Sequence, residues 1–343
     1  MPPLDNRTSF AVHPQLLIGR RGEQLAVAIK ATYVLSPKTL RLELAPEDLR
    51  RQIRMGDIPW GEPGISSIKY PSDLAITKPG TDVVVVAKAY PPKDVSASRF
   101  DVFAKVGELS AALVIYGLRV WDTKGSGFSA PLIAKPVELR YENAWGGTDD
   151  SDPTRFVEEP RNPVGRGVAS DPRTLTGKIA PCIEYAEYPI GNAKTYPPPA
   201  GMGAVARHWE PRRSYAGTYD KAWKDNRAPL IPDDEDDRIH CFAARGLHAQ
   251  EPLLGTEEVG LLNLVPEAGA TRFRLPGAAI EVEFRVSKRD PERLRPHLDT
   301  IIIDTLGMDQ GLPLFVELLW HASTRAPRRV SESTTVVRKV ALS

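Results

Sequence analysis

Proline is the feature that most restricts the fold of this chain. It supplies 32 of the 343 residues, close to twice its usual share of about 5%. Beyond the first turn of a helix, a proline removes a backbone hydrogen bond and clashes with the preceding turn. Thirteen of these prolines lie between Pro136 and Pro232, where the sequence shows little hydrophobic periodicity. The composition therefore disfavours long helices, most of all in the middle of the chain.

Both ends of the chain have the two-residue period of β-strands. Every odd position of residues 25–35 (LAVAIKATYVL) is apolar, and residues 280–286 (IEVEFRV) alternate apolar with charged side chains, as in a half-solvated antiparallel strand. Residues 83–86 (VVVV) are typical of a strand buried on both faces. Further strands are expected over residues 100–106, 111–121, 300–306 and 314–320. Short helical turns are expected after Pro46, placed at the first helical position, and over residues 290–297.

These patterns predict a mainly β protein with antiparallel sheets, arranged as a sandwich or barrel, and few short helices. We divide the chain into a β-rich part (residues 1–135), a loop-rich part (136–250) and a second β-rich part (251–343), packed as one compact unit. The middle part is rich in tryptophan and tyrosine, which disordered segments lack. We therefore expect it to form an ordered layer of loops on the sheets.

Charge and targeting signals narrow the class of protein. The formal net charge of +1 gives no general attraction to nucleic acid or anionic membranes. Cys182 and Cys241 are too few for a disulfide framework and are expected to be free, buried thiols. Residues 1–7 (MPPLDNR) do not resemble a signal peptide, and no stretch approaches the ~20 apolar residues of a membrane span. We expect a cytoplasmic protein.

The sequence contains no recognisable catalytic motif. It lacks a Gly-x-Ser-x-Gly elbow, a His-Glu-x-x-His pair and a dinucleotide-binding fingerprint, and its six histidines are scattered. We therefore predict no catalytic residues, no metal ligands and no cofactor. A pair of catalytic carboxylates among Asp149, Glu158, Asp220 and Asp236 remains open, because such pairs are defined only in space. The acidic run at residues 232–238 (PDDEDDR) does not have the spacing of a calcium loop, which favours a solvated or arginine-paired turn.

Aromatic and arginine side chains of the middle part are the candidates for binding a partner protein, because such residues anchor interfaces. They are Trp145, Arg161, Arg166, Arg207, Trp209, Arg212, Arg213, Tyr215, Tyr219 and Trp223. The alternative for each is a scaffold role. The Gly-Gly pair after Trp145 favours a tight turn packed under that ring. Residues 161–167 (RNPVGRG) form either an anion nest or internal ion pairs to Glu158 or Glu159.

Four segments occur in an order that carries more information than any one of them. They are residues 141–149 (YENAWGGTD), 161–167 (RNPVGRG), 209–212 (WEPR) and 216–227 (AGTYDKAWKDNR). Together they resemble a bacterial family of type VI secretion accessory proteins, long described only as a domain of unknown function and encoded beside PAAR-domain effectors and spike proteins. Residues 239–241 and His321 depart from the usual family pattern.

The resemblance implies a cytoplasmic adaptor, or effector-specific chaperone, without catalytic residues. It would bind a PAAR-domain effector and help to load it onto the spike protein of a type VI secretion system, and it would bind neither nucleic acid nor membrane. Two alternatives remain. The first is a hydrolase on a β-scaffold acting on carbohydrate or cell-wall material. The second is a structural component of the secretion assembly.

Overall fold

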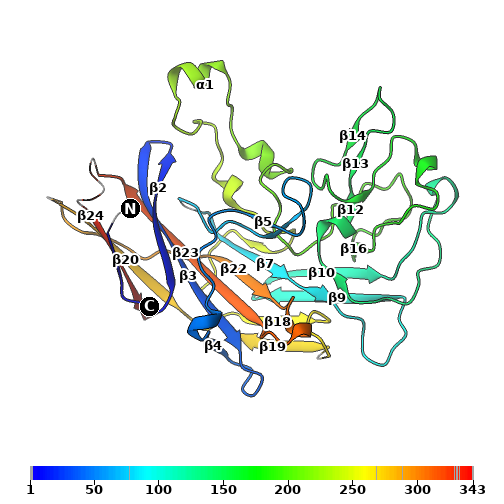
Figure 1. Ribbon diagram of the computed structural model, residues 1–343, viewed down its shortest axis with the longest axis horizontal. Coiled ribbons are helices and arrows are strands. Elements are labelled where there is room, and N and C mark those ends of the chain that lie inside the picture. Colours follow the sequence, from blue (N-terminus) through cyan, green and yellow to red (C-terminus); the bar gives the residue numbers. More distant parts are fainter. Residues whose placement is uncertain are drawn as a thin grey trace.

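The computed structural model describes residues 3–76, 78–267, 269–287, 289–327, 329, 331 and 333–341. It confirms the predicted fold class. The chain is mainly β, with several sheets rich in antiparallel pairs and packed in a sandwich-like arrangement. The described strands close no barrel. Figure 1 shows the long strands from both ends of the chain crossing the centre, with the middle of the chain gathered beside and above them.

The central sheet has seven strands, and it joins the first part of the chain to the last. Its order is β17 (His248–Ala249), β7 (Thr81–Val86), β22 (Leu298–Asp304), β23 (Phe315–Arg325), β3 (Gly22–Leu35) and β2 (Ala11–Gly19), with β4 (Leu42–Leu44) also paired to β3. The long β3–β23 pair runs antiparallel from Phe315 opposite Val34 to Arg325 opposite Gln24. Only β22 and β7 are parallel in this sheet.

Two further sheets cover the main core. One contains, in order, β16 (Ile183–Tyr185), β10 (Leu109–Tyr116), β9 (Arg99–Val106), β18 (Glu258–Leu262) and β19 (Ala270–Arg274). The other contains β1 (Leu4–Asn6), β24 (Ser333–Val340), β20 (Ala279–Val286) and β21 (Glu292–Leu294). Side chains from all three sheets meet in one hydrophobic cluster, which includes Ile29, Val102 and Val282.

The run of four valines in β7 is explained by burial on both faces. Val83 and Val85 join the main cluster, whereas Val84 and Val86 pack with Trp209 and other residues of the middle part in a second cluster. Because neither face of β7 meets water, the strand has no polar alternate positions. The loop-rich part therefore packs on the outer face of the central sheet over β7, β22 and β23.

The rest of the described chain consists of short elements. The paired strands are β5 (Ile58–Pro59) with β6 (Ile68–Tyr70), β8 (Lys88–Ala89) with β11 (Val137–Glu138), β12 (Trp145–Gly146) with β15 (Arg166–Gly167), and β13 (Thr148–Asp149) with β14 (Val157–Glu158). The 3₁₀ turns are η1 (Glu47–Leu49), η2 (Thr123–Gly125), η3 (Tyr141–Asn143), η4 (Pro172–Leu175), η5 (Arg212–Tyr215), η6 (Asp237–His240) and η7 (Met308–Gln310). The single described α-helix is α1 (Lys221–Asn226), and no described helix is long and apolar enough to cross a membrane.

Three local predictions were wrong in detail. Residues 292–294 form strand β21 and not a helical turn, because they pair with β20, where Arg293 donates to the Glu283 carboxylate at 2.9 Å. Pro46 caps η1 from outside the turn and is not its first residue. The strand expected over residues 111–121 ends at Tyr116.

Strand β20 confirms the expected half-solvated strand except at Glu283, since Arg285 is exposed and Glu281 is half-buried. Glu283 was expected to face water, yet it is only 2% exposed. Hydrogen bonds from Arg285 and Arg293 lower the pKa of its carboxyl to about 2. Strand β24 pairs with β20 and supplies Arg338, whose guanidinium lies 2.8 Å from the same carboxylate.

Candidate functional site

The ten predicted binding residues do not form one surface. Trp145, Trp209 and Arg212 are buried; Arg161, Arg166, Tyr215 and Trp223 are half-buried; Arg207, Arg213 and Tyr219 are exposed. The structure places them in three regions: a tight turn around Trp145, a buried layer around Trp209, and a projecting segment that contains α1.

The turn around Trp145 holds the fold through backbone contacts. Gly146 and Gly147 have φ angles of +149° and +107°. A Cβ atom at Gly146 would lie 2.2 Å from the Asn162 carbonyl oxygen, so only glycine fits there. The fully buried Asn162 amide donates to the carbonyls of Tyr141 and Trp145 at 2.9 and 2.8 Å. This region has the structural role that the Gly-Gly pair favoured.

The two arginines of residues 161–167 have different surroundings. The Arg161 guanidinium binds the Glu159 carboxylate at 2.7 Å, which is the internal ion pair considered from the sequence. Burial by itself would raise the pKa of Glu159. The hydrogen bonds and charge of Arg161 have the larger, opposite effect, so the pKa is lowered overall. Arg166 donates instead to the Glu142 carbonyl at 2.7 Å and to the Asn143 side-chain oxygen at 3.1 Å. No carboxylate in the described part of the chain lies within ion-pair distance of Arg166.

Trp209 packs against the central sheet, and Arg212 holds segments of the loop layer together. The Trp209 ring packs edge-on against Tyr141, with centroids 5.5 Å apart. Arg212 donates twice to the Ile239 carbonyl, at 2.9 and 2.7 Å, and once to the Val205 carbonyl at 2.6 Å. Burial lowers the pKa of Arg212 to about 10. In this conformation neither side chain is accessible to a partner.

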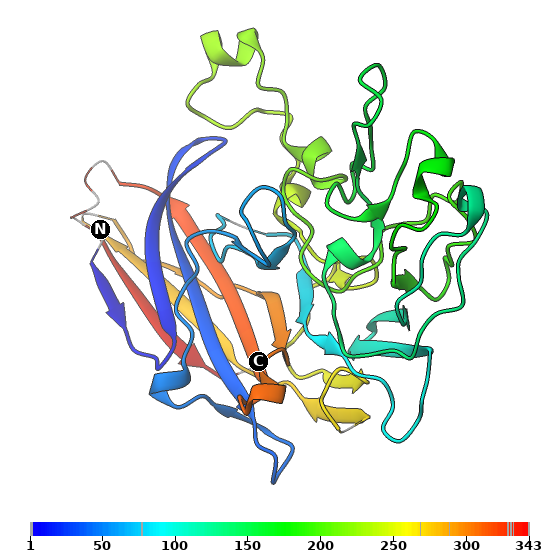
Figure 2. The same ribbon diagram turned by 45° about the vertical axis from the view of Figure 1, so that its right-hand side comes forward.

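Residues 216–236, which we call the arm, project from the body of the molecule (Figures 1 and 2). At its base, the Thr218 amide and hydroxyl donate to the Asp234 carboxylate at 3.0 and 2.7 Å. The Asp236 amide donates to the Tyr215 carbonyl at 3.0 Å. The remaining anchor is Arg20, in the turn between β2 and β3, which donates to the Glu235 carbonyl. These contacts close the arm into a loop with one narrow base.

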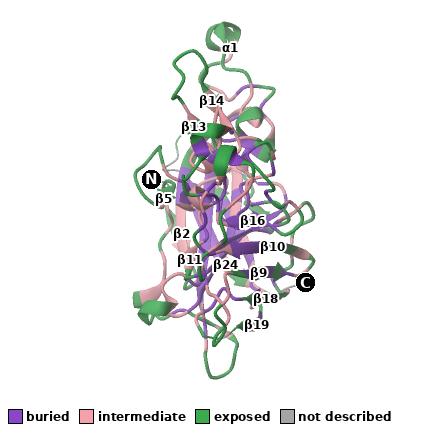
Figure 3. Ribbon diagram, turned by 90° about the vertical axis from the view of Figure 1, so that its right-hand side faces the viewer, coloured by how far each residue is buried: buried purple, intermediate pink, exposed green. Residues whose placement is uncertain are grey.

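The tip of the arm is ordered mainly by local contacts, together with one hydrogen bond from Arg227, at the end of α1, to the Arg20 carbonyl at 2.9 Å. Asp220 caps α1 by accepting from the Trp223 amide at 2.8 Å, and the Trp223 indole N–H donates to the Leu230 carbonyl at 2.8 Å. The rings of Tyr219 and Trp223 meet edge-on at 4.7 Å. No residue of α1 is buried, and Tyr219 is 53% exposed. Figure 3 shows α1 as an exposed element far from the buried strands.

The acidic run at the foot of the arm is paired with arginines, which is one of the two forms expected from the sequence. The pairs are Asp233 with Arg227 at 2.7 Å, Asp236 with Arg238 at 2.6 Å, and Asp237 with Arg20 at 2.9 Å. Hydrogen bonds from Arg238 lower the pKa of Asp236 to about 2. Glu235 differs, because burial raises the pKa of its carboxyl.

The four carboxylates considered for hydrolysis are committed to local hydrogen bonds or lie on separate elements. Asp149 accepts from the Ser170 amide and hydroxyl at 2.6 and 2.8 Å, Asp220 caps α1, and Asp236 binds Arg238. Glu158 is an exposed residue of β14. The pKa shifts of Asp149 and Asp236 are downward, whereas a general acid needs a raised pKa. This geometry provides no support for the hydrolase alternative.

One group of three described residues has the side chains for a metal site. Ligand atoms of Asp82, Cys241 and His248 lie within 4.8 Å of one another. The Asp82 carboxylate already accepts from His248 Nδ1 at 2.8 Å, from Lys78 Nζ at 2.7 Å and from the Phe242 amide at 2.7 Å. Burial raises the pKa of Cys241 to about 12. The protein's own donors therefore satisfy the hydrogen-bonding capacity of this carboxylate. Cys182 and Cys241 are both free thiols, as expected, but they are half-buried where full burial was expected.

Sequence reasoning missed a buried charge network in the central sheet. Glu317 of β23 is fully buried and lies 3.2 Å from Lys30 Nζ, 2.7 Å from Arg51 and 2.6 Å from Arg54. Burial opposes its ionisation, but these cations lower the pKa of Glu317 to about 2. The signal was present in the sequence. Lys30 is the only charged residue of residues 25–35, and Glu317 is the only one of residues 314–320. Buried charges of that kind need a partner.

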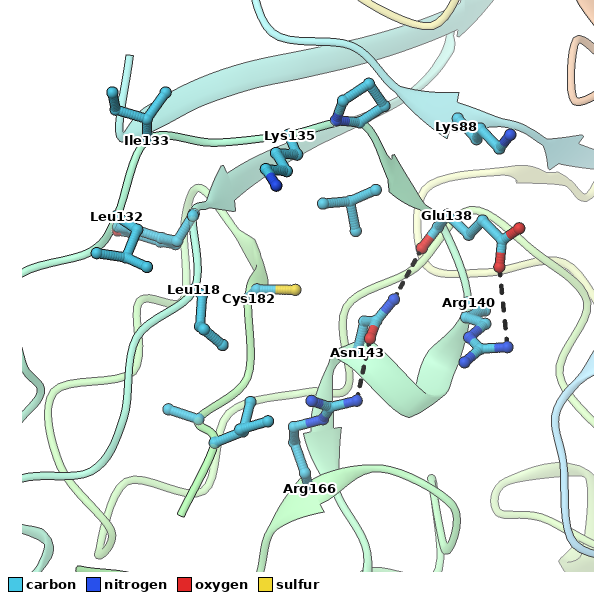
Figure 4. A pocket seen from close by; sticks show the side chains of 16 residues that line it. Lys88, Leu118, Leu132, Ile133, Lys135, Glu138, Arg140, Asn143, Arg166 and Cys182 are labelled. Carbon is cyan, nitrogen blue, oxygen red and sulfur yellow. Dashed lines mark hydrogen bonds and ion pairs between the residues drawn. The ribbon is translucent and has the colours of Figure 1, made fainter. Parts of the chain in front are cut away.

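Sequence reasoning also missed a surface pocket of about 570 Å³ on the loop-rich side of the molecule. Its lining includes Arg166 and four large aliphatic side chains, at Leu118, Leu132, Ile133 and Ile179. Figure 4 shows Lys135, Arg166 and Cys182 directed into it. These residues are scattered over four segments of the chain, so no local pattern indicated that they meet.

Comparison with known proteins places the chain in a family. A family model described as an uncharacterized protein conserved in bacteria matches residues 20–312. The comparison with curated proteins found no match, and neither did the comparison with solved structures. The matched range contains the central strands β3 and β22, the turn around Trp145, the arm and the pocket.

Proposed function

The chain belongs to the DUF2169 family of bacterial proteins, and we propose that it acts as a cytoplasmic adaptor for a type VI secretion system. It binds an effector that carries a PAAR domain and helps to load it onto the spike protein. The order of the four segments in residues 141–227 supports this class of partner, because they resemble those of type VI secretion accessory proteins. The arm is the observation that carries a role in protein binding.

The arm has the properties of a segment that gains its packing from a partner. A helix as short as α1 is unstable by itself, and α1 buries no residue in this protein. Tyrosine and tryptophan bury large areas at low entropic cost and dominate interface energetics. Tyr219 and Trp223 lie together on the arm, where Tyr219 is 53% exposed and Trp223 is half-buried.

The surface beside the arm extends the proposed contact. Arg227 donates to the Arg20 carbonyl at 2.9 Å and thereby ties the arm to the turn between β2 and β3. Near this turn, the edge strand β2 exposes Leu16 and Ile18, at 45% and 43%. A partner that covers the tip of the arm has apolar side chains available on this neighbouring strand.

Co-purification tests the proposal directly. The protein is expressed with the PAAR-domain protein encoded beside it, and the retained partner is quantified. We expect the wild type to retain it and Tyr219→Ala to weaken binding about tenfold, the effect of losing one interface anchor. The matched control is Phe156→Ala, which removes an aromatic ring that is 65% exposed outside the arm; it should change binding less than twofold.

A deletion separates a binding role of the arm from a role in folding. Residues 219–233 are replaced by two glycines, because Thr218 and Asp234 already lie within hydrogen-bonding distance. We expect the truncated protein to keep its β-sheet circular dichroism spectrum and to lose the partner. The proposal would be overturned if the wild-type protein does not bind the PAAR-domain protein and if a strain lacking the gene for this chain still secretes that PAAR-domain protein.

A further inference from the structure

The Arg166 pocket, defined by Leu118, Leu132, Ile133, Lys135, Arg166 and Ile179, combines apolar walls with positive charge. Its four aliphatic side chains are 51–64% exposed, so they form an apolar patch around the opening. The walls come from the loop after β10, from the extended segment before β11 and from the loop before β16. Exposed aliphatic side chains concentrated at one depression favour a binding surface.

The pocket has an excess of positive charge. Four cationic side chains line it, at Lys88, Lys135, Arg140 and Arg166, against the single carboxylate of Glu138. Lys88 binds Asp309 at 2.6 Å, outside the pocket, and Arg140 lies 3.8 Å from Glu138. No described carboxylate lies within ion-pair distance of Lys135 or Arg166. A negatively charged ligand in the pocket would provide an ion-pair partner for Lys135 and Arg166.

Hydrogen bonds hold the Arg166 side chain in an orientation that faces the pocket. Its guanidinium donates to the Asn143 side-chain oxygen at 3.1 Å, and the Asn143 amide donates in turn to the Glu138 carbonyl at 3.1 Å. Figure 4 shows Lys135 and Arg166 reaching into the pocket from opposite sides, with the Cys182 sulfur directed between them. A side chain already fixed by such bonds loses less entropy when it binds a carboxylate.

We propose that the Arg166 pocket binds a short segment of the partner protein in which an aliphatic side chain stands next to aspartate or glutamate. The inference rests on the proposed function and names the chemistry of a second contact, away from the arm. The aliphatic side chain covers Leu118 and Leu132, and the carboxylate binds Lys135 and Arg166. Small molecules are usually enclosed over 70–90% of their surface, whereas this pocket is bordered by exposed side chains and suits one or two residues of a larger partner.

Cys182 provides a direct probe of occupancy, because its sulfur lies in the pocket. In a Cys241→Ser background it is the only thiol of the chain. Burial raises the pKa of Cys182, so alkylation is followed at alkaline pH. The probes are overlapping 15-residue peptides that cover the PAAR-domain partner. We expect peptides with an aliphatic–acidic pair to slow alkylation at least fivefold, and the same peptides with Asn or Gln in place of the acid to lose that protection.

Charge reversal at Lys135 is the second arm of the test. Lys135→Glu should abolish peptide protection and weaken binding of the whole partner at least fivefold. The control is Lys38→Glu, which changes an exposed lysine outside the pocket and should leave both peptide protection and partner binding unchanged. Tyr219→Ala should weaken binding of the whole partner but leave protection of Cys182 by the peptides intact. The inference is overturned if no peptide protects Cys182, or if Lys135→Glu binds the partner as the wild type does. A wild-type protein that binds no PAAR-domain partner contradicts the proposed function itself.

Discussion

Trp145 and Trp223 stand in similar sequence surroundings, near glycine, aspartate and arginine, but they differ in environment. Trp145 is 1% exposed and lies over a turn that only glycines allow. Trp223 is half-buried on an arm whose helix contributes nothing to the core. The comparison shows that residue type alone does not determine whether a tryptophan is buried in the fold or lies on a projecting segment. The turn around Trp145 should carry stability, and the arm should carry binding.

The strongest test of this contrast is Gly146→Ala. The added Cβ would lie 2.2 Å from the Asn162 carbonyl oxygen, at a φ of +149°. We expect a loss of about 3 kcal/mol in the free energy of unfolding, measured by urea denaturation. Gly177→Ala is the control, since its φ is +76° but nothing lies within 4 Å of the new Cβ; it should cost about 1 kcal/mol. Equal losses in both variants would contradict a tight turn.

A smaller effect is expected for Glu159→Gln, which removes the ion pair beside that turn. Loss of the charged hydrogen bonds from Arg161 should cost about 1.5 kcal/mol at neutral pH. The folded-state pKa of Glu159 is lowered from 4.5, so its contribution is full above that value and is lost as the pH falls through the folded pKa. The two proteins should therefore converge in stability as the pH falls from 4.5 through the folded-state pKa of Glu159. A difference that persists at low pH would assign the effect to packing instead.

The smallest effect on stability is expected at the arm. Tyr219→Ala should change the free energy of unfolding by less than about 0.5 kcal/mol, because the side chain packs on the arm and not on the core. Urea denaturation of the variant used in the binding test measures this. A loss comparable to that of Gly146→Ala would show that the arm stabilises the body of the protein, and the contrast between the two regions would fail.

Local sequence patterns were enough to predict the strands and the scarcity of helices. The odd-position period of β3, the valines of β7 and the prolines of the middle part each restrict the backbone or its burial over a few residues. The internal pairing of Arg161 and of the acidic run also followed from neighbours in the sequence. The role of the Gly-Gly pair was predictable for the same reason.

Burial and the meeting of distant residues were decided by the tertiary structure alone. Glu283 of β20 is hidden because β24 and β21 bring arginines onto its face, and Lys30 meets Glu317 only because the two ends of the chain share one sheet. The pocket joins Leu118, Arg166 and Ile179 in the same way. Periodicity and backbone restrictions act over a few residues, whereas contacts across the chain determine which side chains lose water. The sequence therefore determined that this protein is mainly β, and its tertiary structure decided that Trp145 is buried in the fold whereas Trp223 lies half-buried on the arm.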